Sequence, residues 1–584
     1  MMKRKECQRT KRGRILLKIK SLTLMDYRSY DNGEVTLRNY NLVTGPNSSG
    51  KSNLFHALLC FFNYPGFKYE KEKDLRKSSG NDHSKITVKY EFDKDDTGIK
   101  EILSLSQSYN QISISCELDS MNYKLEERPE TKKSTIIKFL EMTKVIFIPA
   151  IPNSEEAFKL TGSTLMRNAM KDIILEIWEN SQSAVKINEV LHNALDQLMN
   201  ERTVGGVSMK QVTDDINKEM KKLNLQLNFD PLLVDSSKIL SNFFTLNPID
   251  TLLNNSVDQE TISTGQLKFL FYNLIRVIKD IDINKKAEPN YHYLKLLIFE
   301  EPEAFLHPSN QLTLANSMRN RSRSEGWQFI ISTHSPHFVS KEIENMQDII
   351  RIERNKSGIS HIFKISEEQF GALKENADYI AYLKKILIDL EPQIKGELKV
   401  EIDNKLSKHD KGLDEFMFHL YLNSERSRLF LSNKVIVCEG ITDKILIENI
   451  IENMGEEYLG EIYVLETNGK YNMVRYLKIL NFFGIKHLIV YDTDRDKPKD
   501  KTLAVNLNEF IDKFTEDNHT FLCGKLTFDP NLEAENGFNI PGYAKLTKDE
   551  KALYVIKKIH ENDIPNYEKI KEKIENKVKS LFVA

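Results

Sequence analysis

Long apolar runs are missing from this sequence of 584 residues, and its N-terminus lacks the apolar centre of a signal peptide. Its five cysteines lie far apart and form neither a CxxC pair nor a Cys/His spacing typical of zinc sites. They are Cys7, Cys60, Cys116, Cys438 and Cys523. We therefore expect a cytoplasmic protein with reduced, mostly buried thiols, no zinc and no contact with a membrane.

An excess of charge of one sign is missing as well. The 83 basic and 85 acidic residues leave a net charge of −2, so any DNA-binding surface must be a local patch. A basic cluster in residues 3–14 is typical of a solvated flank, and a weak phosphate contact is the alternative. The length predicts two or three domains, and the composition is that of a soluble globular protein.

The first motif is a glycine-rich loop between a strand-like segment and an apolar helix pattern. It matches G-x-x-x-x-G-K-[ST] and consists of Gly45, Pro46, Asn47, Ser48, Ser49, Gly50, Lys51 and Ser52. Its two glycines let successive backbone N–H groups turn towards an anion. Lys51 would then reach the β and γ phosphates of ATP, and Ser52 would hold Mg²⁺.

A second element lies far downstream, where the buried-strand pattern of residues 294–299 ends in two acids. Glu300 is placed to steady the Mg²⁺ shell, and Glu301 to orient or deprotonate the attacking water. Between the two elements, Ser263 and Gly265 precede a helix pattern and match the signature loop of ABC-type ATPases. After them, His334 follows a strand pattern and would sense the γ-phosphate. Taken singly, the segment from Ser263 to Gly265 could be an ordinary turn, and His334 could be an ordinary buried histidine.

The order of these four elements and the string EEPEAFLHP, residues 300–308, resemble the ATPase of the SMC and RecF class, and within it the short-headed group that includes OLD proteins. That resemblance implies that the signature loop acts on the partner subunit's nucleotide, so hydrolysis would need a head-to-head dimer. Two features depart from the pattern. Glu300 stands where most ABC ATPases carry Asp, and no Q-loop glutamine is located.

No sustained heptads occur between Ser52 and Leu294, which argues against a long coiled-coil arm. Instead, residues 161–229 contain three helix patterns with apolar stripes, of which one runs through Val190, Leu191 and Leu195. Such stripes are typical of core or dimer contacts. We therefore expect a helical dimerisation insertion at about 155–245 within an ATPase domain of residues 1–366. A charged, helix-like linker at 367–430 would follow it.

Residues 431–584 alternate strand and helix patterns, which predicts a small parallel sheet of βαβ units. Glu439 follows the strand-like run KVIVC, and Asp492 and Asp494 follow HLIVY. These acids should therefore emerge at the carboxyl edge of the sheet, with the two aspartates on one face of their strand. Their oxygens suit Mg²⁺ or Mn²⁺. The alternative for the two aspartates alone is a solvated turn.

A glutamate after the first strand and a DxD after a later one is the layout of the TOPRIM fold. The strings CEGITD, ETNGK, YDTD and DPNLEAE resemble the TOPRIM domain of OLD-family nucleases. This resemblance implies a first metal site of Glu439, Asp492 and Asp494, and a second one helped by Asp443 and Glu533. It also implies a lysine that stabilises phosphate charge in the transition state, for which Lys548 matches best and Lys551 nearly as well.

We identify the chain as an α/β protein of the OLD family: an ABC-type P-loop ATPase with a helical insertion, followed by a Rossmann-like TOPRIM domain. Its domain order also resembles Gabija-type antiphage nucleases. The resemblance implies an ATP-binding, nucleotide-regulated, Mg²⁺-dependent DNA endonuclease. It would nick or cut DNA in antiphage defence, as a homodimer or tetramer, with a helicase-like or other defence protein as partner.

Two rival interpretations remain. In the first, the chain is an ATP-driven DNA-binding clamp or sensor whose TOPRIM site is catalytically idle. The crowding of Glu439, Asp492, Asp494 and Glu533 argues against it, because an idle site has little need for so many like charges. In the second, the ATP site is idle and nucleotide only locks a dimer. Glu301 and His334 argue against this one, though less strongly.

Overall fold

The protein is described by a computed structural model, and chain contacts divide it into two units. One unit comprises residues 1–145, 292–303 and 307–584, and the other comprises 146–291 and 304–306. The described residues are 17–77, 80–151, 181–202, 206, 208–220, 249–250, 255–256, 262–273, 294–324, 326–339, 343–389, 394, 396–410, 424–458, 460–537 and 543–583. None of the helices in these ranges is long and apolar enough to cross a membrane.

The first unit begins with an antiparallel five-stranded sheet in the order β2-β1-β4-β5-β6. Every second residue of its central strand β4 is buried, so one face of the sheet is covered. The strands are β1 (Lys18–Tyr27), β2 (Tyr30–Thr36), β4 (Lys85–Glu91), β5 (Gln111–Glu117) and β6 (Asn122–Leu125). The short helices beside them are α2 (Lys71–Asp74), α3 (Thr97–Leu103) and α4 (Lys133–Leu140).

A second, six-stranded sheet has the order β13-β12-β3-β11-β10-β7, and its four central strands are parallel. All residues of β3 and β11 are buried, which explains why apolar residues predominate in both strands. The strands are β3 (Tyr40–Thr44), β7 (Thr143–Ile148), β10 (Leu294–Glu300), β11 (Trp327–Ser332), β12 (Ile349–Arg354) and β13 (Ser360–Phe363). Helix α1 (Lys51–Phe61) follows β3, as the sequence pattern predicts, and α11 (Pro308–Ser322) follows β10.

The second unit contains much of the expected helical insertion. Of its three predicted helices, the first (166–180) lies outside the described residues, and the others correspond to α7 (Gln182–Asn200) and α8 (Met209–Met220), which pack together. Val190 on α7 is exposed, as a contact surface for a second copy would require. The side chains of Leu191 and Leu195 lie outside the described set. Two short strands, β8 (Ile249–Asp250) and β9 (Asn255–Ser256), also belong to this unit.

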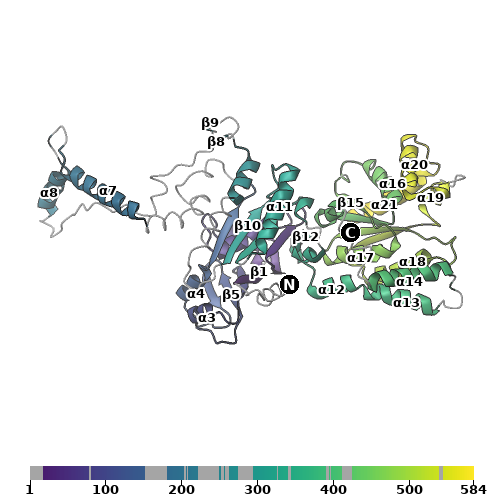
Figure 1. Cartoon of the computed structure of the whole chain (residues 1–584), viewed down its shortest axis with the longest axis horizontal. Helices are drawn as coiled ribbons and strands as arrows, with labels where there is room; N and C mark the ends of the chain where they lie inside the picture. Colours follow the sequence, from purple (N-terminus) through teal and green to yellow (C-terminus); the bar gives the residue numbers. More distant parts are fainter. Residues whose placement is uncertain are drawn as a thin grey trace, which may run out of the picture. The chain divides into compact units, whose positions relative to one another are not determined.

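The C-terminal sheet is parallel throughout and has the order β15-β14-β16-β17. Its strands are β14 (Lys434–Cys438), β15 (Ile462–Glu466), β16 (Lys486–Asp492) and β17 (Leu522–Phe528). Helices α16 (Ile441–Glu452) and α21 (Tyr567–Val583) cover one face, where they bury an aliphatic core. Helices α17 (Lys470–Phe482) and α18 (Leu503–Asp517) lie on the other face (Figure 1). This is the predicted βαβ arrangement.

Three helices fill the predicted linker: α12 (Glu367–Glu375), α13 (Ala377–Asp389) and α14 (Gly396–Asp410). A 3₁₀ segment (Ser424–Leu431) precedes β14. Residues of α13, α14 and α18 share a small apolar core, so these helices brace the C-terminal sheet rather than hang free of it.

Arg351 of β12, which is fully buried, joins the six-stranded sheet to residues next to the C-terminal sheet. Its guanidinium donates hydrogen bonds to the carbonyl oxygens of Phe483 (3.3 Å), Gly484 (3.4 Å) and Ser432 (3.2 Å), and pairs with Glu353 at 2.7 Å. Phe483 and Gly484 directly follow α17. A buried guanidinium thus caps the carboxyl end of a helix, where cations are favoured.

Candidate nucleotide-binding and carboxylate sites

The glycine-rich loop between β3 and α1 has a backbone that only glycine fits at both ends. Gly45 has φ +136°, and a Cβ atom there would lie 2.0 Å from the carbonyl oxygen of Ile352. Gly50 has φ +114°, and its carbonyl oxygen accepts a hydrogen bond from the hydroxyl of buried Tyr30 at 2.9 Å. The loop is therefore braced against β2 and β12 in the shape that a phosphate cradle needs.

Lys51 opens α1, and its ammonium folds back over this loop. It donates hydrogen bonds to the carbonyl oxygens of Gly45 (2.9 Å) and Pro46 (2.8 Å). Burial lowers the pKa of Lys51 to about 8, while Glu301 and Glu303 act in the opposite direction. The lysine is thus held where an incoming phosphate would meet it, with acidic side chains close by.

Two acids after β10, Glu301 and Glu303, interact electrostatically with Lys51. Glu300 is the last residue of the strand, and Glu301 has a left-handed backbone (φ +42°) fixed by its N–H group, which donates to the carbonyl oxygen of Ser332 at 3.0 Å. Partial desolvation and the charge of Lys51 lower the pKa of His334, which follows β11. The structure therefore brings together Lys51, Glu301 and His334, as the sequence predicts for an ATP site.

Glu303 also belongs to this group, although the sequence analysis gave it no role. Burial raises its pKa, and its Oε1 accepts a hydrogen bond from the backbone N–H of His334 at 2.6 Å. Its Oε2 is buried and has no hydrogen-bond partner within the described ranges. The available signal was its place three residues after Glu300 in the EEPE run. This orphaned oxygen fits a site that holds Mg²⁺ with ATP.

Ser263 and Gly265 lie in the second unit. The hydroxyl oxygen of Ser263 accepts a hydrogen bond from the backbone N–H of Gln266 at 3.3 Å and so caps a helix over 264–273. A Cβ atom on Gly265 would lie 2.3 Å from the carbonyl oxygen of Phe305, so only glycine fits. The expected helix is present, and the action of this loop on a second copy's nucleotide stays a prediction.

The C-terminal acids gather at the carboxyl edge of the parallel sheet, as predicted. Glu439 directly follows β14, and Asp492 is the last residue of β16. Asp443 lies in the first turn of α16, where its Oδ2 accepts the N–H of Gly440 at 2.9 Å. Asp492 Oδ1 accepts the N–H of Leu532 at 2.9 Å, which fixes α19 (Leu532–Glu535) and thereby Glu533.

Burial and mutual repulsion dominate the electrostatics of this cluster. Burial raises the pKa of Asp443 to about 8, with Glu439 and Glu533 adding to the rise. Burial likewise raises the pKa of Asp492 to about 9, with contributions from Asp443, Glu439 and Glu533. The pKa of Glu439 is raised too, and its buried Oε2 accepts no hydrogen bond from the described residues. Four carboxyl groups this close favour protonation or a bound cation.

Asp494 differs from the expected strand alternation. Strand β16 ends at Asp492, and Asp494 adopts a left-handed backbone (φ +51°), so its direction is set by the turn. Its carboxylate pairs with two lysines: Lys470, the buried first residue of α17, and Lys497 at 2.7 Å. Lys470 also lies 3.9 Å from Glu439 Oε2. Lys470 was not predicted as a site residue, although it is the last residue of the string ETNGK.

As the side chains stand, no three acidic, histidine or cysteine residues in the described ranges are arranged to hold a metal ion. The pairing of Asp494 and Glu439 with Lys470 accounts for this, because a cation already neutralises that side of the cluster. The donor set nevertheless fits a hard divalent cation, since it consists of carboxylate oxygens and includes Glu439 Oε2, which is buried and accepts no hydrogen bond from the described residues.

The two candidate lysines lie in α20 (Lys548–His560), which packs against α16. The side chain of Lys548 is outside the described set. The ammonium of Lys551 lies 5.3 Å from the ring centre of Tyr543. Burial raises the pKa of Tyr543, and Glu533 and Asp443 contribute to the rise, so this ring borders the carboxylate cluster. The choice between the two lysines stays a prediction.

Together these features define a P-loop ATPase followed by a parallel-sheet domain with a carboxylate centre. A family model described as an AAA ATPase domain matches residues 17–339, more than half of the chain, so the chain belongs to that family. A second model, the TOPRIM domain of proteins like the overcoming lysogenization defect protein, matches residues 430–494. The predicted domain types and their order are confirmed.

Two curated relatives are nucleases by name, and one of them is an OLD protein. Endonuclease GajA of Bacillus cereus (strain VD045) is 23% identical over 530 residues, covering 83% of this chain and 76% of that protein. Old nuclease of Escherichia phage P2 is 22% identical over 365 residues, covering 60% of this chain and 53% of that protein. The chain is homologous to both and spans about half the length of the phage protein.

Solved structures similar to the chain include an SMC head bound to the C-winged helix domain of ScpA. The TM-score is 0.35 at 16% identity, covering 60% of this chain and 98% of that one. The structure of the recombination mediator protein RecF with ATPrS has a TM-score of 0.29 at 13% identity. The match covers 60% of this chain and 99% of that one.

The two lysines on Asp494 differ in exposure, and this difference yields a matched pair of variants. The Lys470 side chain is 1% exposed and that of Lys497 is 47% exposed. We expect Lys470→Met to destabilise the metal-free protein by about 3 kcal/mol, because it leaves buried carboxylates without their cation. It should also tighten Mn²⁺ binding about tenfold, because metal no longer competes with an internal ammonium.

Thermal unfolding without metal and calorimetric Mn²⁺ titration measure the two effects. Lys497→Met is the control: solvent screens its ion pair, so both changes should be much smaller. Equal effects of the two substitutions on Mn²⁺ affinity would show that Lys470 is not the internal counter-cation.

Proposed function

We propose that the chain is a nucleotide-regulated, Mg²⁺- or Mn²⁺-dependent DNA endonuclease that acts through its TOPRIM domain. The observation that carries this proposal is the crowding of Glu439, Asp443, Asp492 and Glu533 at the carboxyl edge of the parallel sheet. Like charges buried this closely are costly to folding, and a structural role alone gives no return for that cost. The nuclease names of two homologous proteins support the same reaction class.

Glu439 interacts electrostatically with two groups of residues. Lys470 and Asp494 form the first group. Asp443 and Asp492 belong to the second group, and the charge of Glu439 contributes to the raised pKa values of both. Glu439 would therefore be shared by two cation positions, one with Asp494 and one with Asp443, Asp492 and Glu533. Cations bound there activate a water and stabilise the departing 3′ oxygen of a phosphodiester.

The remaining steps belong to the protein's own side chains. Asp492 is held by the N–H of Leu532, so the end of β17 and α19 fix the geometry of the metal-binding edge. A lysine at the start of α20, Lys548 or Lys551, would offset charge on the non-bridging phosphate oxygens in the transition state.

At the ATP site, Lys51 would bind the β and γ phosphates, Ser52 and Glu300 would hold Mg²⁺, and Glu301 would orient the water. Ser263 and Gly265 of a second copy would complete the site, so we propose a homodimer, with which a tetramer is compatible. A role in antiphage defence, a defence partner such as a helicase-like protein and a cytoplasmic location are proposed from the resemblance to Gabija-type nucleases.

Arg351 and α17 could transmit the effect of nucleotide binding to the nuclease site. Arg351 pairs in register with Thr44, the residue before the phosphate loop, and caps the carboxyl end of α17. The first residue of the same helix is Lys470, which neutralises Asp494 and Glu439. A shift of β12 on nucleotide binding would thus act on the helix that carries the nuclease site's internal cation.

Cleavage of supercoiled plasmid tests the proposed activity. Wild type should nick or cut the plasmid with Mg²⁺ or Mn²⁺, and Glu439→Ala and Asp494→Ala should reduce the rate by a factor on the order of 10² or more. Lys51→Ala should retain cleavage and lose its response to ATP and to a non-hydrolysable analogue, because it loses nucleotide binding. Glu301→Gln should still bind nucleotide but not hydrolyse it, so its response to ATP should equal its response to the analogue.

If Glu439→Ala cuts as well as wild type, the carboxylate centre is not the nuclease. Nucleotide-dependent DNA binding without any cleavage by wild type would instead support the clamp or sensor with an idle TOPRIM site. An unchanged nucleotide response in Lys51→Ala would remove the regulatory part of the proposal.

Arg351→Lys tests the link between the two domains. Lysine keeps the charge but cannot serve three carbonyl oxygens in the same geometry, so we expect the nucleotide effect on cleavage to fall severalfold while ATP hydrolysis persists. The control is Arg354→Lys on the same strand, because Arg354 is exposed and bonds locally to Gly358. An undiminished nucleotide effect in a folded Arg351→Lys protein would show that coupling takes another route.

A further inference from the structure

Two lysines hold the carboxylate of Asp494, and they differ in their access to solvent. The side chain of Lys470 is 1% exposed, and its ammonium also lies 3.9 Å from Glu439 Oε2. The side chain of Lys497 is 47% exposed, and its ammonium lies 2.7 Å from Asp494 Oδ1. Among the described residues, Asp494 is the only ion-pair partner of Lys497. The carboxylate is thus held by one buried cation and by one that solvent reaches.

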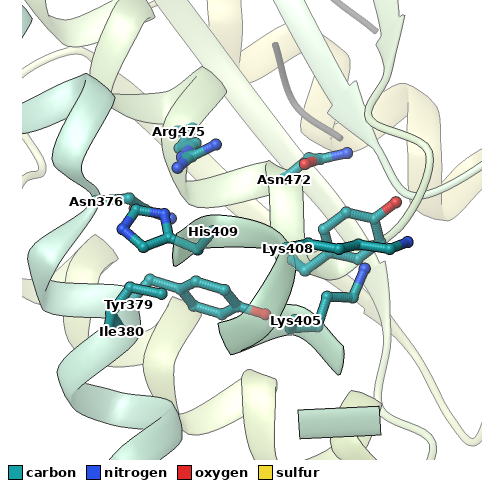
Figure 2. A pocket seen from close by; sticks show the side chains of 9 residues that line it. Asn376, Tyr379, Ile380, Lys405, Lys408, His409, Asn472 and Arg475 are labelled. Carbon is teal, nitrogen blue, oxygen red and sulfur yellow. The ribbon is translucent and has the colours of Figure 1, made fainter. Parts of the chain in front are cut away.

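The residues after Lys470 on α17 are covered by helices α13 and α14. Figure 2 shows Asn472 and Arg475 of α17 beside side chains of those two helices. The cavity among them is about 30 Å³, which has room for water but not for a phosphodiester. A ligand therefore cannot approach Lys470 through this cavity, and Lys497 is the lysine of Asp494 that a ligand from solvent can reach.

The backbone around Lys497 is a short turn that keeps this lysine beside the carboxylate. The N–H of Lys497 donates to the carbonyl oxygen of Asp494 at 2.9 Å, and the N–H of Asp494 donates to the carbonyl oxygen of Pro530 at 2.8 Å. The turn fixes where the side chain begins. Because a lysine side chain is a flexible stem with a compact charge at its end, the ammonium can leave Asp494 without a change in the backbone.

The charge of Lys497 also interacts with the carboxylate cluster beyond Asp494. Partial burial lowers the pKa of Lys497, whereas the hydrogen bond and charge of Asp494, together with Asp496 and Glu439, raise it more. Lys497 is therefore a charged side chain within electrostatic reach of Glu439, the residue that we assign to both cation positions.

Lys497 loses its partner when Asp494 serves as a metal ligand. Its ammonium would then lie beside a carboxylate whose charge is already neutralised, and another anion would stabilise it better. The phosphodiester that is cleaved at this site supplies such an anion, because its non-bridging oxygens carry the negative charge. The position of Lys497 therefore suits a contact that forms only when both the carboxylates and the substrate are in use.

We propose that Lys497 exchanges Asp494 for a phosphate of the DNA and so binds the substrate in the nuclease site. The proposal rests on the proposed nuclease function for the position of the DNA. Lys497 would act as a point charge on a non-bridging phosphate oxygen. In the metal-free protein without DNA, its pair with Asp494 cancels this charge.

Lys497 would act on a different group of carboxylates from the lysine of α20. Lys551 lies beside Tyr543, whose pKa is raised by burial, with contributions from Glu533 and Asp443. Lys497 instead lies at Asp494. The two positively charged side chains would therefore contact the phosphate backbone at different points.

A double-mutant cycle on DNA affinity tests the exchange without cleavage. A fluorescent duplex is titrated in EDTA, and its anisotropy gives the dissociation constant. Asp494→Asn imitates a neutralised carboxylate and frees Lys497 without metal. In the wild-type background, Lys497→Gln should change affinity by less than about twofold, because Asp494 already cancels its charge. In the Asp494→Asn background it should weaken binding about tenfold and lower the slope of log K against log salt by about 1.

Lys499→Gln is the matched control for this cycle. Lys499 lies two residues further on, is 58% exposed and pairs with Glu509 rather than with the carboxylate cluster. Its effect on DNA affinity should be the same in both backgrounds, because independent sites contribute additively. Equal effects of Lys497→Gln in the two backgrounds would overturn the proposal.

A second arm retains Asp494 and so does not depend on the folding of Asp494→Asn. At a Ca²⁺ concentration that saturates the protein by calorimetry, Lys497→Gln should weaken DNA binding about tenfold, with a gel to show that the duplex is intact. Lys497→Arg should stay within about threefold of wild type, because it retains the charge. If Lys497→Gln binds DNA like wild type in Ca²⁺ as well as in EDTA, the proposal is wrong.

Plasmid cleavage separates this proposal from the proposed function. If Glu439→Ala cleaves like wild type while the cycle shows coupling between Asp494 and Lys497, the nuclease assignment fails and the phosphate contact stands. If cleavage depends on Glu439 and the cycle shows no coupling, the nuclease assignment stands and the role of Lys497 is refuted.

Discussion

The repulsion among buried carboxylates at the end of one parallel sheet is the constraint on which the other features depend. Burial and neighbouring charges raise the pKa values of Asp443 and Asp492 far above those of free side chains. Such a cluster survives folding because protons and one internal ammonium, that of Lys470, offset its charge. We expect the same repulsion to favour a divalent cation, because a bound cation would replace both the protons and the ammonium. Lys470 should thus stabilise the metal-free protein and at the same time weaken its affinity for metal.

Helix α17 connects this constraint to the rest of the molecule. Its first residue, Lys470, pairs with Asp494, and its carboxyl end is capped by Arg351 from the ATPase sheet. Arg351 in turn pairs in register with the strand that ends at the phosphate loop. A helix is stiff along its axis, so we expect a displacement at one end of α17 to reach the other end and to link the nucleotide site to the carboxylates.

Much of the fold and many of the site residues were predictable from the sequence, because the motifs depend on local geometry. The loop of residues 45–52 and the acids after β14 and β16 follow from strand, turn and helix patterns, and the structure places them as expected. What could not be predicted depends on contacts between distant segments. The strand pattern implied one face for both aspartates, but β16 ends at Asp492 and a turn directs Asp494 to Lys470. Neither Glu303 nor Arg351 carries a local signal, since burial against remote residues gives each its role.

A crystal of the full chain soaked in Mn²⁺ and measured at the manganese absorption edge tests the central claim most directly. The account predicts an anomalous peak bound by Glu439, with the ammonium of Lys470 moved away from Asp494 to make room for the cation. A peak elsewhere, or an intact Lys470–Asp494 pair in crystals whose other Mn²⁺ sites are filled, would contradict the claim that these carboxylates form a metal-dependent centre balanced by an internal lysine.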